Sequence, residues 1–189
     1  MAHSMEIERR FFIDGRSSKP WRNGSKSSTI KQYYLDYEWF SISTFNLNYQ
    51  HLCLLELSQQ EAEIIGSSNH WTSRIRLVDK RAILTMKGKR SGASAMELEW
   101  DIATDLAIEI IALKVVPYVE KTRYYWEGSD GLVWEVDEFE GGLAGLILAE
   151  VELLDESQEV VMPEWLGMEL TGLLNWSNSS LAHTLANKY

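Results

Sequence analysis

The sequence predicts a mainly β (α+β) protein, a closed antiparallel β-barrel with a charged interior and helices packed outside. Two observations predict this fold class. Most segments alternate with a period of two, as strands do. Seven of these segments carry a pair or triplet of charged residues at that spacing, with apolar residues at the positions between them.

The composition is that of an ordinary globular domain, and we interpret residues 5–189 as one domain, treating residues 1–4 as vector-derived. The chain has 189 residues, with 45% hydrophobic and 24% charged residues. Eight Trp and eight Tyr favour strands. The net charge of −10 argues against nucleic-acid binding through a broad basic surface. A single cysteine, Cys53, excludes an intramolecular disulfide. No apolar run is long enough for a membrane span and no apolar signal region is visible, so a cytoplasmic location is expected.

Eight strands are predicted from the alternation. They cover residues 5–13, 29–37, 71–78, 81–89, 95–102, 119–127, 132–140 and 146–154, and residues 40–47 are a further candidate. Asp79 and Lys80 form a tight hairpin turn between two of them.

Two helices are predicted, over residues 103–116 and 58–65. The first has an apolar face and is stopped by Pro117. The second begins with a capping box, formed by Ser58 and Glu61, and ends at Gly66. A shorter helix is expected near residues 156–161.

Charged residues two apart share a face of each predicted strand. The sets are Glu6, Glu8 and Arg10; Arg74 and Arg76; Lys87 and Lys89; Glu97 and Glu99; Lys121 and Arg123; Glu135 and Asp137; and Glu150 and Glu152. A sheet with one solvated face is the simpler explanation for any single strand. Solvated faces usually mix both signs across neighbouring strands, whereas most of these sets carry one sign. A barrel with a polar lumen also leaves its outer face free for the helices and removes the sheet edges.

Grouped bases and grouped acids inside a barrel indicate two kinds of ligand. Arg and Lys donate several hydrogen bonds to phosphate oxygens. Carboxylate oxygens are suitable ligands for Mg²⁺ or Mn²⁺. Burying either group unpaired is costly, so we expect a phosphate ligand and a divalent cation to balance them.

The segment M-E-I-E-R-R-F-F at residues 5–12 resembles the Glu-x-Glu-x-Lys signature of the CYTH superfamily, the triphosphate tunnel metalloenzymes. Further segments agree in order along nearly the whole chain: I-K-Q-Y-Y-L (30–35), R-I-R-L (74–77), L-T-M-K-G-K (84–89), E-L-E-W-D-I (97–102), V-E-K-T-R-Y (119–124), W-E-V-D-E-F-E-G (134–141), G-L-I-L-A-E-V-E-L (145–153) and W-S-N-S-S-L-A (176–182).

This resemblance implies an eight-stranded tunnel, a small-molecule triphosphate substrate and dependence on Mg²⁺ or Mn²⁺. The implied metal ligands are Glu6, Glu8, Glu150 and Glu152, with Asp137 nearby. The implied phosphate ligands are Arg10, Lys31, Arg74, Arg76, Lys87, Lys121 and Arg123. The implied catalytic residues are Glu6, Glu8, Arg10 and Tyr34. Glu97, Glu99 and Glu135 also match the pattern, without a defined role.

The chain departs from the family pattern at three places. Arg10 replaces the usual Lys, which with the Tyr matching Tyr34 helps to activate water in some members; Arg stays protonated and is a poor base. Residues 36–71 form a long insertion, either a lid or a structural element. Asn175 and Trp176 replace a base and a Tyr before Ser-Asn.

Several activities stay open from the sequence. The first is hydrolysis of inorganic triphosphate. The alternatives are a thiamine triphosphatase, a class IV-like adenylyl cyclase, a polyphosphate- or nucleotide-binding module without catalysis, and a structural β-domain. No nucleic-acid or membrane partner is expected, and the resemblance makes a homodimer an open alternative.

Overall fold

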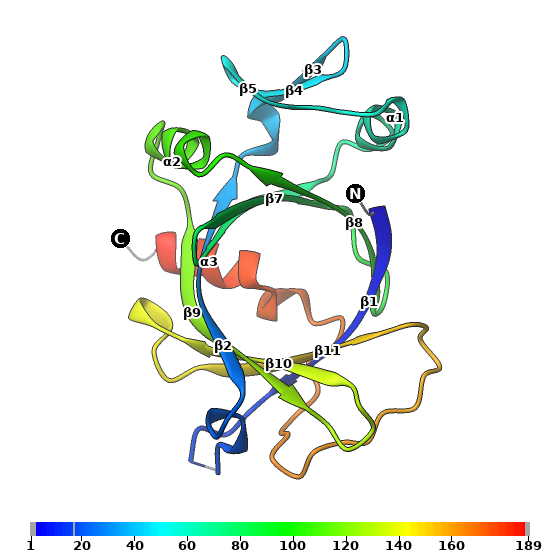
Figure 1. Cartoon of the computed structure of the whole chain (residues 1–189), viewed down its shortest axis with the longest axis vertical. Helices are drawn as coiled ribbons and strands as arrows, with labels where there is room; N and C mark the ends of the chain where they lie inside the picture. Colours follow the sequence, from blue (N-terminus) through cyan, green and yellow to red (C-terminus); the bar gives the residue numbers. More distant parts are fainter. Residues whose placement is uncertain (1–2, 17, 188–189) are drawn as a thin grey trace.

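The computed structural model describes residues 3–16 and 18–187, and its centre is a closed barrel of eight antiparallel strands (Figure 1). The barrel order is β1-β11-β10-β9-β2-β6-β7-β8. The strands are β1 (His3–Phe12), β2 (Lys26–Leu35), β6 (Thr72–Val78), β7 (Arg81–Lys87), β8 (Ser94–Ile102), β9 (Tyr118–Glu127), β10 (Val133–Phe139) and β11 (Ile147–Leu153). The predicted fold class is confirmed, and each of the eight predicted barrel strands is present.

The barrel strands differ from the prediction mainly at their ends. His3 and Ser4, which were set aside as vector-derived, continue β1 and pair with Leu98 and Glu97 of β8. Residues 1 and 2 lie outside the described residues. The predicted turn at Asp79 and Lys80 joins β6 to β7, and Asp79 adopts the left-handed conformation there, with φ of 52°.

The insertion forms a small sheet of β3 (Phe40–Ser43), β4 (Asn46–Tyr49) and β5 (Leu52–Glu56), followed by helix α1 (Gln59–Gly66). The prediction of one strand over residues 40–47 is wrong, because Thr44, with φ of 57°, turns the chain back on itself. The capping box of α1 is confirmed: Ser58 and Glu61 each accept a hydrogen bond from the other's backbone N–H.

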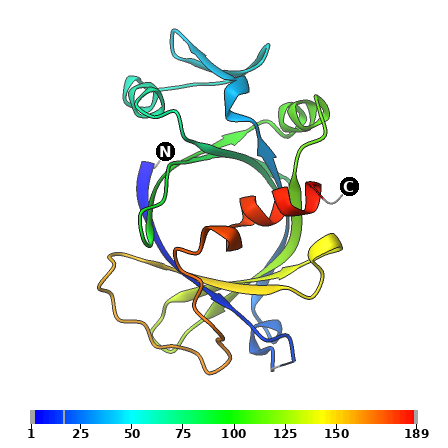
Figure 2. The ribbon, with the colours of Figure 1, turned by 180° about the vertical axis from the view of Figure 1, so that it is seen from behind.

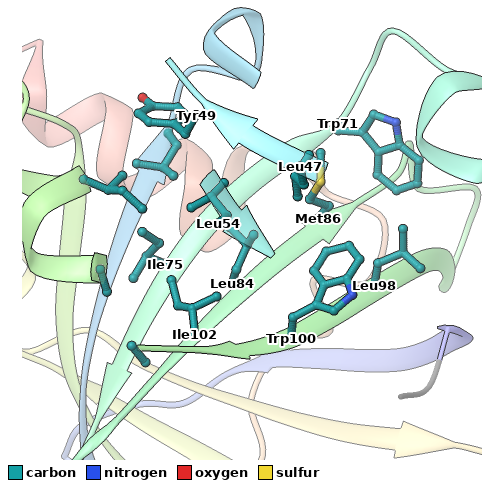
Figure 3. Packing of buried hydrophobic residues seen from close by; sticks show 14 of the residues in the cluster. Leu47, Tyr49, Leu54, Trp71, Ile75, Leu84, Met86, Leu98, Trp100 and Ile102 are labelled. Atoms are coloured by element: carbon teal, nitrogen blue, oxygen red, sulfur yellow. The ribbon is translucent and has the colours of Figure 1, made fainter. Parts of the chain in front are cut away.

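The insertion and helix α2 (Thr104–Ala112) pack against the outer face of β6, β7 and β8 (Figures 1 and 3). The residues labelled in this core are Leu47, Tyr49, Leu54, Trp71, Ile75, Leu84, Met86, Leu98, Trp100 and Ile102. Helix α2 ends at Ala112, four residues before the predicted end, and Val115 beyond it is 97% exposed. The insertion packs on the barrel wall, and residues 69–71 at its end line a cavity.

A second outer core lies under β1, β10 and β11, where Trp21, Trp134 and Trp165 pack together. The segment that follows β11 has a turn at Glu156 and Ser157, so the predicted helix over residues 156–161 is absent.

Helix α3 (Asn178–Ala186) lies across one end of the barrel rather than on its wall, as Figure 2 shows. It covers inward-facing apolar residues of four strands, Tyr34, Val119, Phe139 and Leu148, through Ala182. The sequence analysis did not predict this helix. None of the helices in the described residues is long and apolar enough to span a membrane.

Candidate functional site

Charged side chains from seven barrel strands converge inside the barrel around a central cavity of about 90 Å³. Strict alternation along each strand places them there, while their apolar neighbours, such as Ile75 between Arg74 and Arg76, face the outer core. The cavity is lined by Glu6, Glu8, Arg10, Arg74, Arg76, Lys87, Glu97, Glu99, Arg123, Glu135, Glu150, Glu152 and Asn178. The prediction that like-signed side chains meet in one enclosed space is confirmed.

The end of the barrel away from α3 opens through an acidic mouth of about 370 Å³. Its charged lining residues are Glu6, Glu97, Glu99 and Glu152. Glu152 lies directly opposite Glu8 on the neighbouring strand, an arrangement that is unfavourable for two like charges. Burial and the nearby Glu8 raise the pKa of Glu6 to about 7, and the same two causes raise the pKa of Glu152.

Two guanidinium groups in the central cavity, those of Arg74 and Arg76, donate no hydrogen bond to any described residue, and their side chains are 13% and 18% exposed. Their nearest carboxylates are at 3.7 Å (Glu97 and Glu99 from Arg74) and 3.9 Å (Glu99 from Arg76), beyond hydrogen-bond length. The Nε atoms of both are buried without an acceptor. Burial and the charges of Arg74 and Arg123 lower the pKa of Arg76 to about 10. An anion in the cavity would meet these unused donors.

The base of the cavity, under α3, holds an ion-pair network that is complete without a ligand. Asp137 accepts hydrogen bonds from Lys121 at 2.5 Å and from Arg123 at 2.6 and 2.7 Å. Arg123 also contacts Glu135 and Glu150. Lys121 and Asp137 are only 0% and 1% exposed and do not line the cavity. The assignment of Asp137 to the metal and of Lys121 to phosphate is therefore corrected: Asp137 binds Arg123 and Lys121, and neither Asp137 nor Lys121 reaches the cavity.

Arg10, at the centre of the lumen, is held by three acceptors. It donates to Glu150 (2.6 Å), to Glu8 (3.0 Å) and to the backbone oxygen of Trp176 (3.1 Å). Burial opposes its charge, but the carboxylates of Glu150 and Glu8 raise its pKa above the usual value. Such a group stabilises negative charge and does not accept a proton.

Tyr34 is buried beside Arg10, and its hydroxyl accepts a hydrogen bond from Gln32 at 2.9 Å. Burial raises its pKa, so it is also not placed as a base. Tyr34 and Arg10 both line the α3 side of the lumen.

Lys31 lies outside the barrel, and its assignment to the substrate is corrected. Ser28, Ile30, Gln32 and Tyr34 form the buried inner row of β2, so the odd position of Lys31 points outward. There it pairs with Glu120 at 2.5 Å. Lys31 and Tyr34 are three residues apart and cannot share one face of a regular strand.

Arg90, which lies between the predicted strands 81–89 and 95–102 and was given no role, points into the lumen. Its guanidinium donates to Glu8 at 2.5 Å and lies 3.6 Å from Glu6. Strand β7 ends at Lys87, whose side chain lines the lumen. Regular alternation would place Lys89 inside next. The chain is irregular at Gly88, so Arg90 reaches the lumen instead and Lys89 is exposed. Glycine at the end of an alternating run was the available signal for this change of face.

The acidic residues fit a hard divalent cation by their chemistry. No three of the described acidic, His or Cys side chains are arranged as a ready ligand cluster. Instead, bases contact these acids: Lys87 pairs with Glu6 and with Glu97, and Arg90 pairs with Glu8. Glu152 has no hydrogen bond or ion pair within the described part of the chain. Glu6, Glu8 and Glu152 together offer the carboxylate oxygens that Mg²⁺ and Mn²⁺ prefer.

The chain is similar to two curated proteins called inorganic triphosphatase. That of Acetivibrio thermocellus is 41% identical over 109 residues, which are 57% of this chain and 69% of the relative. That of Nitrosomonas europaea is 44% identical over 66 residues, 34% of this chain and 44% of the relative. No protein-family model matches the chain.

Solved structures agree with these relatives in fold. The crystal structure of the inorganic triphosphatase NE1496 superposes with a TM-score of 0.57 at 25% identity, over 96% of this chain and 97% of that one. A second structure, described as the hypothetical protein NE1496, gives a TM-score of 0.56 at 26% identity, over 94% and 97%. By the Acetivibrio thermocellus relative, the chain belongs to the inorganic triphosphatase family.

Proposed function

We propose that this protein is a triphosphate tunnel metalloenzyme, of the CYTH superfamily, that hydrolyses inorganic triphosphate with Mg²⁺ or Mn²⁺. The observation that carries the proposal is the pair Arg74 and Arg76, whose guanidinium groups lie in the lumen without a hydrogen-bond acceptor among the described residues. Phosphate oxygens supply such acceptors, and charge-assisted hydrogen bonds to phosphate are among the stronger ones in proteins. Similarity to proteins named inorganic triphosphatase supports the same substrate.

The reaction is an in-line attack of water on a terminal phosphorus atom. A new P–O bond forms to the water oxygen, the bond from phosphorus to the bridging oxygen breaks, and phosphate and diphosphate leave. Arg10, Arg74 and Arg76 stabilise the negative charge that develops on the phosphate oxygens. The positive charge of Arg123, which also lines the central cavity, adds to the stabilisation by these three residues.

The metal would be held by Glu6, Glu8 and Glu152, and it would supply further charge neutralisation on the phosphates. Lys87 and Arg90, which now contact the acids, are long side chains that can turn toward the phosphates instead. Neither Arg10 nor Tyr34 is placed to accept the proton of the attacking water, so we assign that role to a carboxylate of the acidic mouth.

The test is a substrate panel. Phosphate release is measured from inorganic triphosphate, thiamine triphosphate and ATP, each with Mg²⁺, with Mn²⁺ and with excess chelator, and cyclic AMP is measured in the ATP arm. We expect turnover of inorganic triphosphate that stops with the chelator. Turnover without metal would refute the metal dependence. Tight binding without any turnover would favour a polyphosphate- or nucleotide-binding module. This is the nearest alternative, because Arg10, which stands in place of the family's Lys, stays protonated and cannot act as a base.

A further inference from the structure

A second, larger cavity of about 460 Å³ adjoins the central cavity on the α3 side; we name it the vestibule. The two cavities share Arg10, Arg74, Lys87 and Asn178 in their linings, so one leads into the other. The vestibule lining adds Lys89 and Arg90 and contains no carboxylate. The lumen is therefore polarised, with an acidic mouth at one end and a basic vestibule at the other.

The sizes and charges of the two cavities favour the vestibule for part of a triphosphate. The central cavity, at about 90 Å³, is about a fifth of the size of the vestibule, at about 460 Å³. The acidic mouth repels the remainder of the anion, because its charged residues are all carboxylates. The chain of phosphates must extend toward the bases of the vestibule.

The first turn of α3 borders the vestibule with free backbone donors. The Ser177 hydroxyl caps the helix by accepting the backbone N–H of Ser180 at 3.1 Å. The N–H groups of Asn178 and Ser179 come earlier in the helix and have no acceptor within the described residues. Ser177, Asn178 and Ser179 all line the vestibule. Free N–H groups and the positive end of the helix dipole favour an anion at this position.

The side chain of Asn178 is the independent sign of a ligand at this turn. It is only 7% exposed, it lines both cavities, and its Oδ1 atom is buried without a hydrogen-bond partner in the described chain. A buried oxygen without a donor is costly for the fold. That Oδ1 atom is an acceptor and is not satisfied by an anion, but the NH₂ group of the same amide has no acceptor among the described residues and would donate to an anion in the cavity.

We propose that the first turn of α3, through the Asn178 amide and the N–H groups of Asn178 and Ser179, forms a phosphate subsite. This subsite holds the phosphate of the substrate that lies farthest from the acidic mouth. The inference rests on the proposed function and assigns the orientation of the substrate in the lumen: the reacting end toward the acids, the other end against α3. The subsite makes affinity depend on chain length, because a chain of three phosphates would contact Arg76 and the first turn of α3 together.

The test uses Asn178→Ala, Asn178→Asp and a control, Asn187→Ala, at the exposed far end of the same helix. Calorimetry measures the affinity of the full chain for inorganic triphosphate and for diphosphate in Mg²⁺, and thermal unfolding measures stability without ligand. For Asn178→Ala we expect triphosphate affinity to fall about tenfold, diphosphate affinity to stay within twofold and Tm to stay equal or rise, since an unbonded polar group is removed. Asn178→Asp should lose far more triphosphate affinity without loss of Tm, because an acid at a helix start is favourable in the free protein.

Wild-type triphosphate affinity in both Asn178 variants overturns the subsite, as does an equal loss for diphosphate and triphosphate. A lowered Tm in Asn178→Ala would show a structural amide and also overturn it. These outcomes are separate from a failure of the proposed function. If the wild-type protein binds triphosphate without hydrolysing it, the proposed function is refuted, but the proposed subsite is not.

Discussion

Arg76 gives the sharpest test of the proposed phosphate site, because burial and the charges of Arg74 and Arg123 disfavour its own positive charge. The side chain is 18% exposed, and its closest carboxylate oxygen, on Glu99, is 3.9 Å away. The perturbation is Arg76→Met, which keeps a long side chain and removes the charge. We expect the ligand-free variant to be more stable than the wild type, although it loses an ion pair.

The magnitude follows from the pKa of Arg76, which is lowered from 12.5 to about 10. Each pKa unit corresponds to about 1.4 kcal/mol, so holding the charge at neutral pH costs up to roughly 3 kcal/mol. This shift already includes the favourable charges of Glu99 and Glu97, so removing the charge of Arg76 should gain about 1–3 kcal/mol. For a chain of this size that is a rise in Tm of about 2–10 °C. The affinity for inorganic triphosphate should fall about 10- to 100-fold, as for one lost hydrogen bond to a charged group.

The assay pairs thermal unfolding without ligand with calorimetry of inorganic triphosphate. Arg81→Met is the matched control, because Arg81 is exposed and pairs with Asp101 on the outside of the barrel. It should change stability by less than about 1 kcal/mol and leave affinity unaltered. A destabilised Arg76→Met with unaltered affinity would refute the reasoning, since it would mean that Glu99 already satisfies the guanidinium.

Three further substitutions separate the lumen from the barrel wall. Glu8→Gln should lower kcat at least about 100-fold with the circular dichroism spectrum retained, because Glu8 contacts Arg10 and Arg90 and faces Glu152; wild-type turnover would remove the carboxylates from the mechanism. Lys31→Ala should leave kcat and KM within twofold, because Lys31 is on the outer face, and a large rise in KM would contradict the placement given above. Ser58→Ala should lower stability by about 1 kcal/mol through the lost cap of α1 without changing KM; a changed KM would mean that the insertion reaches the substrate.

The barrel could be predicted from the sequence because its two signals are local and strong. Alternation with a period of two identifies each strand, and the same alternation assigns each side chain to the inner or outer face. The inward positions of Arg74 and Arg76, of Glu6 and Glu8, and of Glu150 followed from that rule alone. Closure followed from the need to give both the charged and the apolar faces a place away from water.

The errors lie where local rules and motif matching diverge, or where tertiary contacts decide. Lys31 was assigned by its match to a family segment, although period two placed it opposite Tyr34 on the strand. Asp137 has the parity of an inner residue, but only the structure shows that Lys121 and Arg123 occupy both of its oxygens. Helix α3 has few apolar residues, because it covers one barrel end with a narrow face around Ala182. Its sequence therefore lacks the broad apolar stripe that identifies a helix.

The charges around the central cavity indicate why the proposed function needs two ligands. Seven carboxylates and five bases line it. An anion alone would leave the carboxylates of the acidic mouth without a cation. A divalent cation alone would leave the guanidinium groups of Arg74 and Arg76 without hydrogen-bond acceptors in a low-dielectric space. In the proposed complex, a cation at the acidic mouth and a phosphate chain at the bases would satisfy both groups. Each ligand should therefore bind more tightly when the other is present.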